Sequence, residues 1–365
     1  MFPTEFLNKT KQTIIKIPES LYSTFLMVEQ EIQLKFIPVL ERRFFDTVFL
    51  LGCGDSFILS EASKYTFKKY ARVATFAENA FEFNNYEFLI TPSTLVIGFS
   101  AGGRTSATVN ALKKAKENGA FTIGITNTPN TPIESVSDIT LYTRVANPVG
   151  PPTATTVTAL LVSNLLALYI GNANGAISSK AFVDLKTKLG AISTKAKEIM
   201  SDKNKDTNMA AAKYFATKKD VYAIGGGPLY AAAMLTNAKF KEIVYVHSEA
   251  IEVEEFCHYG MIPVEPETPI ILFAHSGKSF NRVKEVVETL KEIGTKNYIV
   301  TDNPTEFLDS AEYIIETPKN VIEEFAPIVD MIPIYFLSLH FSVNRGLKVS
   351  GFRYGDKLTK LIGYL

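Results

Sequence analysis

A run of glycines and hydroxyl side chains, FSAGGRT, is the segment of the sequence best suited to hold an anion. It follows an apolar stretch that ends at Phe99 and precedes an amphipathic stretch that begins near Thr105, so it predicts a strand-to-helix turn. Amides at such a turn, with the hydroxyls of Ser100 and Thr105, suit a phosphate dianion. Ser56, in GCGDSF, can reach the same place. The alternative is an ordinary turn with hydroxyl caps.

Lys239 and Glu242, three residues apart, form a second candidate group. They fall in a mostly apolar stretch, Leu229–Val246, which predicts a buried helix with both side chains on one face. An exposed Lys/Glu pair would contribute little to stability. Burying a carboxylate costs free energy even beside a lysine, so such a pair is expected mainly where it has a chemical role. The pair is therefore a candidate for acid–base chemistry.

The second half of the chain repeats the first at a distance of roughly 175 residues, which indicates duplication of a whole domain. TVFLLGCGDSF is matched by DVYAIGGGPLY, and TPSTLVIGFSAGGRT is matched by TPIILFAHSGKSF. Within each half, apolar strands alternate with amphipathic helical stretches. The pattern predicts an α/β fold of two tandem domains, each with a parallel sheet between layers of helices.

The predicted organisation has five parts: a helical extension (1–43), a first domain (44–171), a helical linker (172–206), a second domain (207–345) and a C-terminal tail (346–365). Ligands of parallel sheets gather at the carboxyl ends of the strands, which groups the turns after Leu51 and Phe99. The second half has fewer hydroxyls in the matching turns, since GGGPLY lacks a serine at the place of Ser56. We therefore expect one phosphate site per chain.

Composition excludes several classes of protein. The 365 residues contain 38 Lys+Arg and 38 Asp+Glu, and a zero net charge argues against a nucleic-acid partner. Cys53 and Cys257 stand outside any metal-ligand spacing, and we expect no disulfide, no metal and no cofactor. No apolar signal core opens the sequence, which favours the cytoplasm. The apolar runs Val157–Gly171, too short for a bilayer, and Ile328–Val343 predict buried helices rather than membrane spans.

The GCGDSF and FSAGGRTSAT motifs and the duplicated layout resemble the sugar isomerase (SIS) family, with two such domains in tandem. The chain looks like the isomerase half of glucosamine-6-phosphate synthase and like phosphosugar deglycases and deaminases. The resemblance implies flavodoxin-like, three-layer domains. The family usually has Ser at the place of Gly102, so one hydroxyl donor is missing here, and it often has Thr at the place of Asp55, which changes the recognition of the sugar hydroxyls. The substrate contacts that the resemblance implies come from Cys53, Ser56, Ser100, the backbone of Gly102, Thr105 and Thr153.

The resemblance also implies the catalytic groups. Glu242 would carry a proton between C1 and C2 of the open-chain sugar, while Lys239 holds the substrate or tunes the carboxylate. The EEFCHYG segment is similar to the family's ring-opening motif, in which His258 takes the place of the histidine. Lys360 in the tail matches a lysine that lies over the sugar, with Lys357 as the alternative. In relatives the histidine reaches the neighbouring subunit's site, which implies a homodimer with composite active sites.

These features predict an enzyme that acts on a 6-phosphosugar or amino-sugar phosphate, such as glucosamine 6-phosphate or fructose 6-phosphate, in its open-chain form. Because the sequence begins with its N-terminal helix, we expect no glutaminase domain and no glutamine-dependent amination. Isomerisation, deamination and deglycation of a substrate such as fructoselysine 6-phosphate need the same base, and all three stay open. A non-catalytic sugar-phosphate sensor is the alternative, and it needs the phosphate loop but not the catalytic groups.

Overall fold

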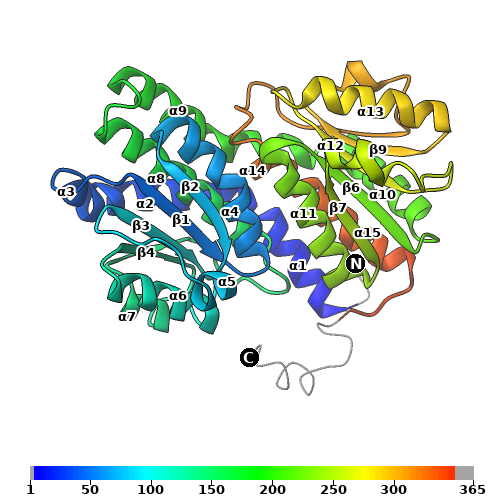
Figure 1. Cartoon of the computed structure of the whole chain (residues 1–365). Helices are drawn as coiled ribbons and strands as arrows, with labels where there is room; N and C mark the ends of the chain where they lie inside the picture. Colours follow the sequence, from blue (N-terminus) through cyan, green and yellow to red (C-terminus); the bar gives the residue numbers. More distant parts are fainter. Residues whose placement is uncertain (1–3, 350–365) are drawn as a thin grey trace. The chain divides into compact units, whose positions relative to one another are not determined.

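The computed structural model describes residues 4–349 and contains two five-stranded, fully parallel sheets (Figure 1). The first sheet has the order β2-β1-β3-β4-β5, and the second has the corresponding order β7-β6-β8-β9-β10. This is the flavodoxin-like strand order. The second strand lies on one side of the first, and the remaining three strands are added on its other side. The prediction of an α/β fold with two parallel sheets is confirmed.

The β1–β5 unit is formed by residues 17–146 and 154–193. Helices α2, α4 and α8 pack together beside the sheet, and α5, α6 and α7 form a second group of helices. The strands are β1 (Thr47–Gly52), β2 (Ala74–Asn79), β3 (Thr94–Phe99), β4 (Phe121–Thr126) and β5 (Ile139–Tyr142). The helices are α2 (Ile17–Glu31), α3 (Ile37–Leu40), α4 (Asp55–Thr66), α5 (Ala80–Asn85), α6 (Ser106–Glu117), α7 (Pro132–Val136), α8 (Ala154–Ala173) and α9 (Ser179–Lys195).

The β6–β10 unit is formed by residues 4–16, 147–153 and 194–349. Helices α10, α11 and α15 pack together, and α12 packs against α13. The strands are β6 (Asp220–Gly225), β7 (His247–Glu252), β8 (Ile270–Ala274), β9 (Asn297–Thr301) and β10 (Tyr313–Glu316). The helices are α1 (Glu5–Ile15), α10 (Asp202–Phe215), α11 (Tyr230–Lys239), α12 (Val253–Glu255), α13 (Phe280–Ile293), α14 (Pro327–Asp330) and α15 (Ile332–Asn344).

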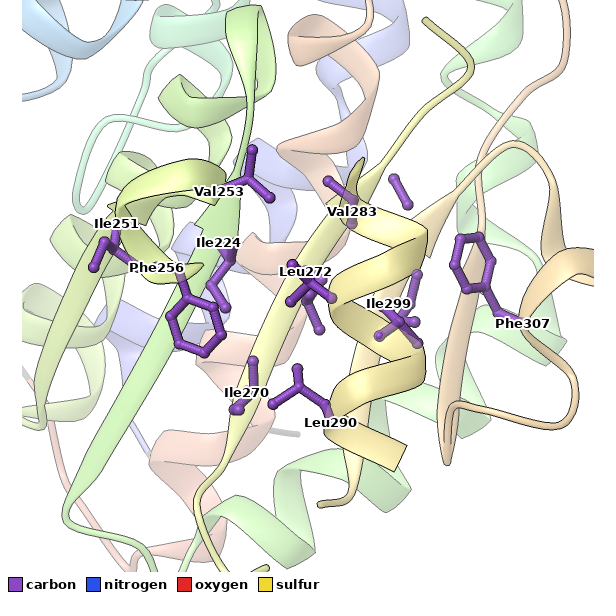
Figure 2. Close-up of a cluster of buried hydrophobic side chains, with 13 residues drawn as sticks. Ile224, Ile251, Val253, Phe256, Ile270, Leu272, Val283, Leu290, Ile299 and Phe307 are labelled. Carbon is purple, nitrogen blue, oxygen red and sulfur yellow. The ribbon is translucent and has the colours of Figure 1, made fainter. Parts of the chain in front are cut away.

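Helix α13 illustrates why these segments form layers on the sheets. Its apolar residues recur at helical spacing, and Val283 and Leu290 lie against Leu272 and Ile299 of the sheet (Figure 2). All four side chains are buried, and each such burial contributes about 1.5–3 kcal/mol. The helix ends at Gly294, whose left-handed backbone (φ 92°) closes the last turn. The helix therefore covers the sheet along one apolar stripe.

Helix α8 corrects one expectation from the sequence. It runs for 20 residues with a mean hydropathy of 1.6, so the argument that this apolar run is too short for a bilayer is wrong. The prediction of a buried helix is nevertheless confirmed, because its apolar window is entirely buried. Its polar side chains meet α4, where Ser163 lies 2.5 Å from Ser63 and Asn164 accepts a hydrogen bond from Thr66 at 2.8 Å. The helix thus belongs to the core of the β1–β5 unit.

Candidate functional site

The turns that carry Ser56 and Ser100 lie side by side at one edge of the first sheet. Strands β1 and β3 pair in parallel, with Leu51 opposite Gly98, so both turns leave the sheet at adjacent carboxyl ends. Between these two strands the order of the sheet reverses, and this is where open α/β sheets bind ligands. The structure therefore brings the two predicted hydroxyl-bearing turns together.

The loop from Ser100 to Thr105 is held in a defined shape. Ser100 is only 2% exposed, and its Oγ lies 3.0 Å from Thr105 Oγ1. Gly103 adopts a left-handed backbone (φ 65°), and a side chain there would come within 2.0 Å of Thr131 Oγ1. Only glycine fits this position without moving Thr131. The loop is therefore preorganised around the serine and threonine hydroxyls.

The N-terminal end of α6 is left open to an anion. Thr105 is its N-cap, but the threonine side chain makes no cap hydrogen bond, and no acidic residue stands in the first turn. The first amides of a helix lack internal partners and carry the positive end of its dipole. A Cβ added to the exposed Gly102 would meet no atom within 4 Å. Across residues 4–349, no carboxylate hydrogen-bonds to this loop. Amides, hydroxyls and dipole together suit a phosphate.

Two residues that the sequence did not single out fix the back of this loop. Thr126 Oγ1 and the Asn127 amide donate to the carbonyl oxygen of Ala101, at 3.2 and 2.9 Å. Both stand at the carboxyl end of β4, the next strand in the sheet. The repeat of TNTP as TDNP in the second half was the signal that could have identified them.

The turn after β1 places Ser56 in the first turn of α4. A side chain at Gly52 would lie 2.4 Å from the Ser56 carbonyl carbon, so the close approach of strand and helix requires glycine. Cys53 is half-buried, and burial raises the pKa of its thiol although the Ala80 amide opposes this. Cys53 is therefore a neutral thiol at physiological pH rather than a reactive thiolate.

The other polar side chain of this turn, Asp55, points into the unit. It is buried, and it accepts a hydrogen bond from Thr156 Oγ1 at 2.9 Å. Thr153, another predicted contact residue, belongs to the β6–β10 unit. Its carbonyl accepts a hydrogen bond from the Tyr335 hydroxyl at 3.3 Å, and its own buried Oγ1 has no partner among the described residues. Buried hydroxyls without a hydrogen-bond partner are uncommon in native proteins.

The Lys239–Glu242 pair is formed, but only its lysine is buried. Lys239 ends α11 with its side chain 0% exposed, and its Nζ donates to Glu242 Oε2 at 2.6 Å. Glu242 is 39% exposed, so the expectation of a buried carboxylate is wrong. The reason is local: after Lys239 the chain widens into a π-helical turn, Phe240–Val244, which ends at Tyr245 in left-handed conformation. π-Turns of this kind are frequent at functional sites.

The first half provides an internal comparison for this pair. It has the same π-turn, Phe67–Ala71, which ends at Arg72 in left-handed conformation. Counted from the starts of β1 and β6, Lys239 corresponds to Thr66 and Glu242 to Lys69. The fold therefore forms this turn without a lysine–glutamate pair. The backbone of the turn therefore does not require the Lys239–Glu242 pair.

His258 lies on the surface of the β6–β10 unit. It belongs to the π-helical turn Phe256–Gly260, its side chain is 71% exposed, and its Nε2 lies 3.8 Å from Glu254 Oε1. Within residues 4–349 it makes no hydrogen bond or ion pair with Lys239 or Glu242. Lys360 lies outside the described residues, as does its alternative, Lys357. Their roles stay predictions, and in the described part no cluster of His, Cys, Asp and Glu has a metal-binding arrangement.

The open loop makes a direct prediction. Replacing Ser100 with alanine should raise the Kd for inorganic phosphate about tenfold or more, because a hydrogen bond to a charged group contributes roughly 1.5–3 kcal/mol. Isothermal titration calorimetry would measure the change. Ser135→Ala, which removes an exposed hydroxyl of α7 that bonds only the Pro132 carbonyl, is the matched control. Equal phosphate affinity in the two variants would show that the anion does not bind at this loop.

Comparison with known proteins supports the assignment of the fold and the motifs. The chain is 28% identical over 338 residues to glutamine–fructose-6-phosphate aminotransferase (isomerizing) of Clostridium tetani, covering 92% of this chain and 55% of that protein. It is 30% identical over 303 residues to the enzyme of the same name from Yersinia pestis, covering 82% and 49%. The chain thus spans about half the length of these curated relatives.

Two solved structures share the fold of the chain. The C-terminal domain of glucosamine-fructose-6-phosphate aminotransferase from Francisella tularensis superposes with a TM-score of 0.85 at 22% identity, covering 94% of this chain and 98% of that one. Glucosamine-6-phosphate deaminase from Thermotoga maritima gives 0.70 at 20% identity, covering 93% and 95%. The SIS domain family model matches residues 45–169 and 214–345. The chain therefore belongs to the SIS domain family, with two such domains in tandem.

Proposed function

We propose that the chain is a phosphosugar-processing enzyme that moves a proton between neighbouring carbons of an open-chain sugar phosphate. Three observations support the proposal: the open loop at Ser100–Thr105, the Lys239–Glu242 pair and the membership of the SIS family. The relatives named above act on phosphorylated hexoses or hexosamines according to their names. A 6-phosphosugar or amino-sugar phosphate is therefore the proposed substrate class.

The Lys239–Glu242 pair carries the proposal. A fully buried lysine holds one oxygen of a carboxylate that is itself accessible to solvent. A general base needs this combination, because the carboxylate must be oriented and must also reach the proton that it abstracts. A purely structural ion pair has no such need, and the matching residues of the first half, Thr66 and Lys69, are of types that cannot form an ion pair with each other.

In the proposed reaction, the loop at Ser100–Thr105 binds the phosphoryl group and positions the sugar chain. Glu242 takes the proton from the carbon next to the carbonyl, the C–H electrons form a carbon–carbon double bond, and the carbonyl oxygen takes up a proton. Glu242 then returns the proton to the former carbonyl carbon while the other hydroxyl of the enediol gives up its proton, and the oxygen of that hydroxyl becomes the carbonyl of the isomeric sugar. The Lys239 ammonium orients the carboxylate throughout. His258 is proposed to open the sugar ring beforehand, from a position that serves the partner chain of a homodimer.

The test uses the intact protein with glucosamine 6-phosphate, fructose 6-phosphate and a 6-phosphofructosamine, each in D2O. Release of ammonia indicates deamination, release of free amine indicates deglycation, and a new sugar phosphate indicates isomerisation. Deuterium that enters C1 or C2 reports proton abstraction, and NMR detects it even where no net reaction follows. Binding of these sugars with neither exchange nor product would contradict the proposal and would favour the sensor.

A further inference from the structure

The second sheet has its own counterpart of the anion loop, in the turn His275–Ser279 between β8 and α13. A carboxylate of the protein already lies in this turn. The Lys278 amide donates to Glu323 Oε1 at 2.8 Å, and a Cβ added to Gly277 would lie 2.2 Å from the carboxyl carbon of Glu323. Glycine at this position is what lets the carboxylate approach the backbone.

The two loops therefore differ in what fills them. A side chain at Gly102 in the first loop would meet no atom within 4 Å, whereas the space at Gly277 is taken by Glu323. The residue that corresponds to Glu323 is also different. Strands β5 and β10 are each followed by a left-handed asparagine, Asn147 and Asn320 (φ 47° and 59°), and counting on from these matches Glu323 to Gly150.

A second carboxylate reinforces the closure. Asp302 Oδ1 accepts a hydrogen bond from the Ser276 amide at 2.8 Å, and the matching residue of the first half is the neutral Asn127. His275 stands where the first loop has Ser100, and its buried ring is engaged by Asp330 rather than open to a ligand. Two amides of the second loop are thus satisfied by carboxylates of the protein itself.

We propose that Glu323 acts as an internal anion that closes the second loop, so that the chain offers one phosphoryl-binding loop and not two. An internal carboxylate competes well with free phosphate because it loses no translational freedom on binding. Its negative charge and that of Asp302 also repel a dianion. The inference rests on the proposed function only in taking the first loop as the phosphoryl site.

The variant that tests the proposal combines Glu323→Gly with Asp302→Asn, which transplants the residues of the first half. Hydrogen exchange at the Lys278 amide reads the second loop alone. In the unmodified protein this amide should exchange slowly, at a rate that millimolar inorganic phosphate does not change. In the double variant exchange should become about tenfold faster or more without phosphate and slow again with it. A folded double variant whose Lys278 exchange does not respond to phosphate would overturn the proposal.

Two further variants keep the test decisive. Asp309→Gly, which removes an exposed carboxylate elsewhere on the unit, should leave Lys278 exchange unchanged and phosphate-independent. If the double variant does not fold, the same exchange measurement is made on the single Glu323→Gly variant. Unchanged Lys278 exchange in that variant would overturn the proposal. Phosphate binding at the Ser100 loop is measured separately by calorimetry. If the proposed function is wrong, that measurement fails, whereas Lys278 exchange tests only the closure of the second loop.

Discussion

Replacing Glu242 with glutamine is expected to lower kcat by about 100- to 10,000-fold, the usual contribution of a general base. The amide keeps the size of the side chain and an oxygen that can accept from Lys239, so the local structure should persist. It cannot accept the substrate proton. The affinity for phosphosugar should change little, because the Ser100–Thr105 loop that binds the phosphoryl group is untouched. Steady-state kinetics and calorimetry on the variant would separate the two effects.

Glu249→Gln is the matched control for this prediction, since Glu249 is an exposed glutamate on β7 of the same unit. Its kcat should equal that of the unmodified protein. A Glu242→Gln variant that kept full activity would mean that another group abstracts the proton. The deuterium exchange described above should be lost together with turnover, because both depend on the same carboxylate.

Of the substitutions considered, His275→Ala should lower the free energy of unfolding the most. Its ring is fully buried, with Nδ1 3.1 Å from Asp330 Oδ2 and Nε2 3.1 Å from the Val321 carbonyl. His275→Ala would leave the buried Asp330 carboxylate without its cation, and such changes cost about 3–5 kcal/mol. Urea unfolding followed by circular dichroism would measure the decrease. His247→Ala, at an exposed histidine of β7, should leave the unfolding midpoint unchanged.

The same pair makes stability depend on pH in a defined direction. Burial alone would lower the pKa of His275, but the carboxylates of Asp330 and Asp302 outweigh burial and raise that pKa from 6.5 to about 9. A histidine whose pKa is raised in the folded state stabilises fully below pH 6.5 and loses that contribution as pH rises through 9. The free energy of unfolding should therefore fall between pH 6.5 and 9. A His275→Ala variant with the same decline would assign it to other groups.

The central strands could be predicted from the sequence because they are buried on both faces. Strand β1 and its counterpart β6 are short apolar runs that end in glycine. The edge strands β2 and β7 were not identified. Their sequences, ATFAEN and HSEAIE, are partly exposed, and they carry charged or polar side chains that an edge strand tolerates. Nothing local distinguishes such segments from loops.

The candidate site likewise has features that the sequence predicts and features that it does not. The hydroxyl loop was recognisable because its glycines and hydroxyls are contiguous, and the apolar residues around Lys239 correctly predicted a largely buried helix. The exposure of Glu242 depends on a π-turn, which spacing along the sequence does not reveal. Glu323 and Lys278 are far apart in the sequence, so no local motif predicts the hydrogen bond between them.

The π-turn also says something about descent. It stands at the same place in both halves, and in both it ends in a left-handed residue, Arg72 or Tyr245. A feature shared by two copies is most simply inherited from their common ancestor, whereas the lysine and glutamate are found in one copy only. The turn then predates the divergence of the two halves. The two halves thus keep the same backbone turn but carry different side chains on it, Thr66 and Lys69 in one and Lys239 and Glu242 in the other.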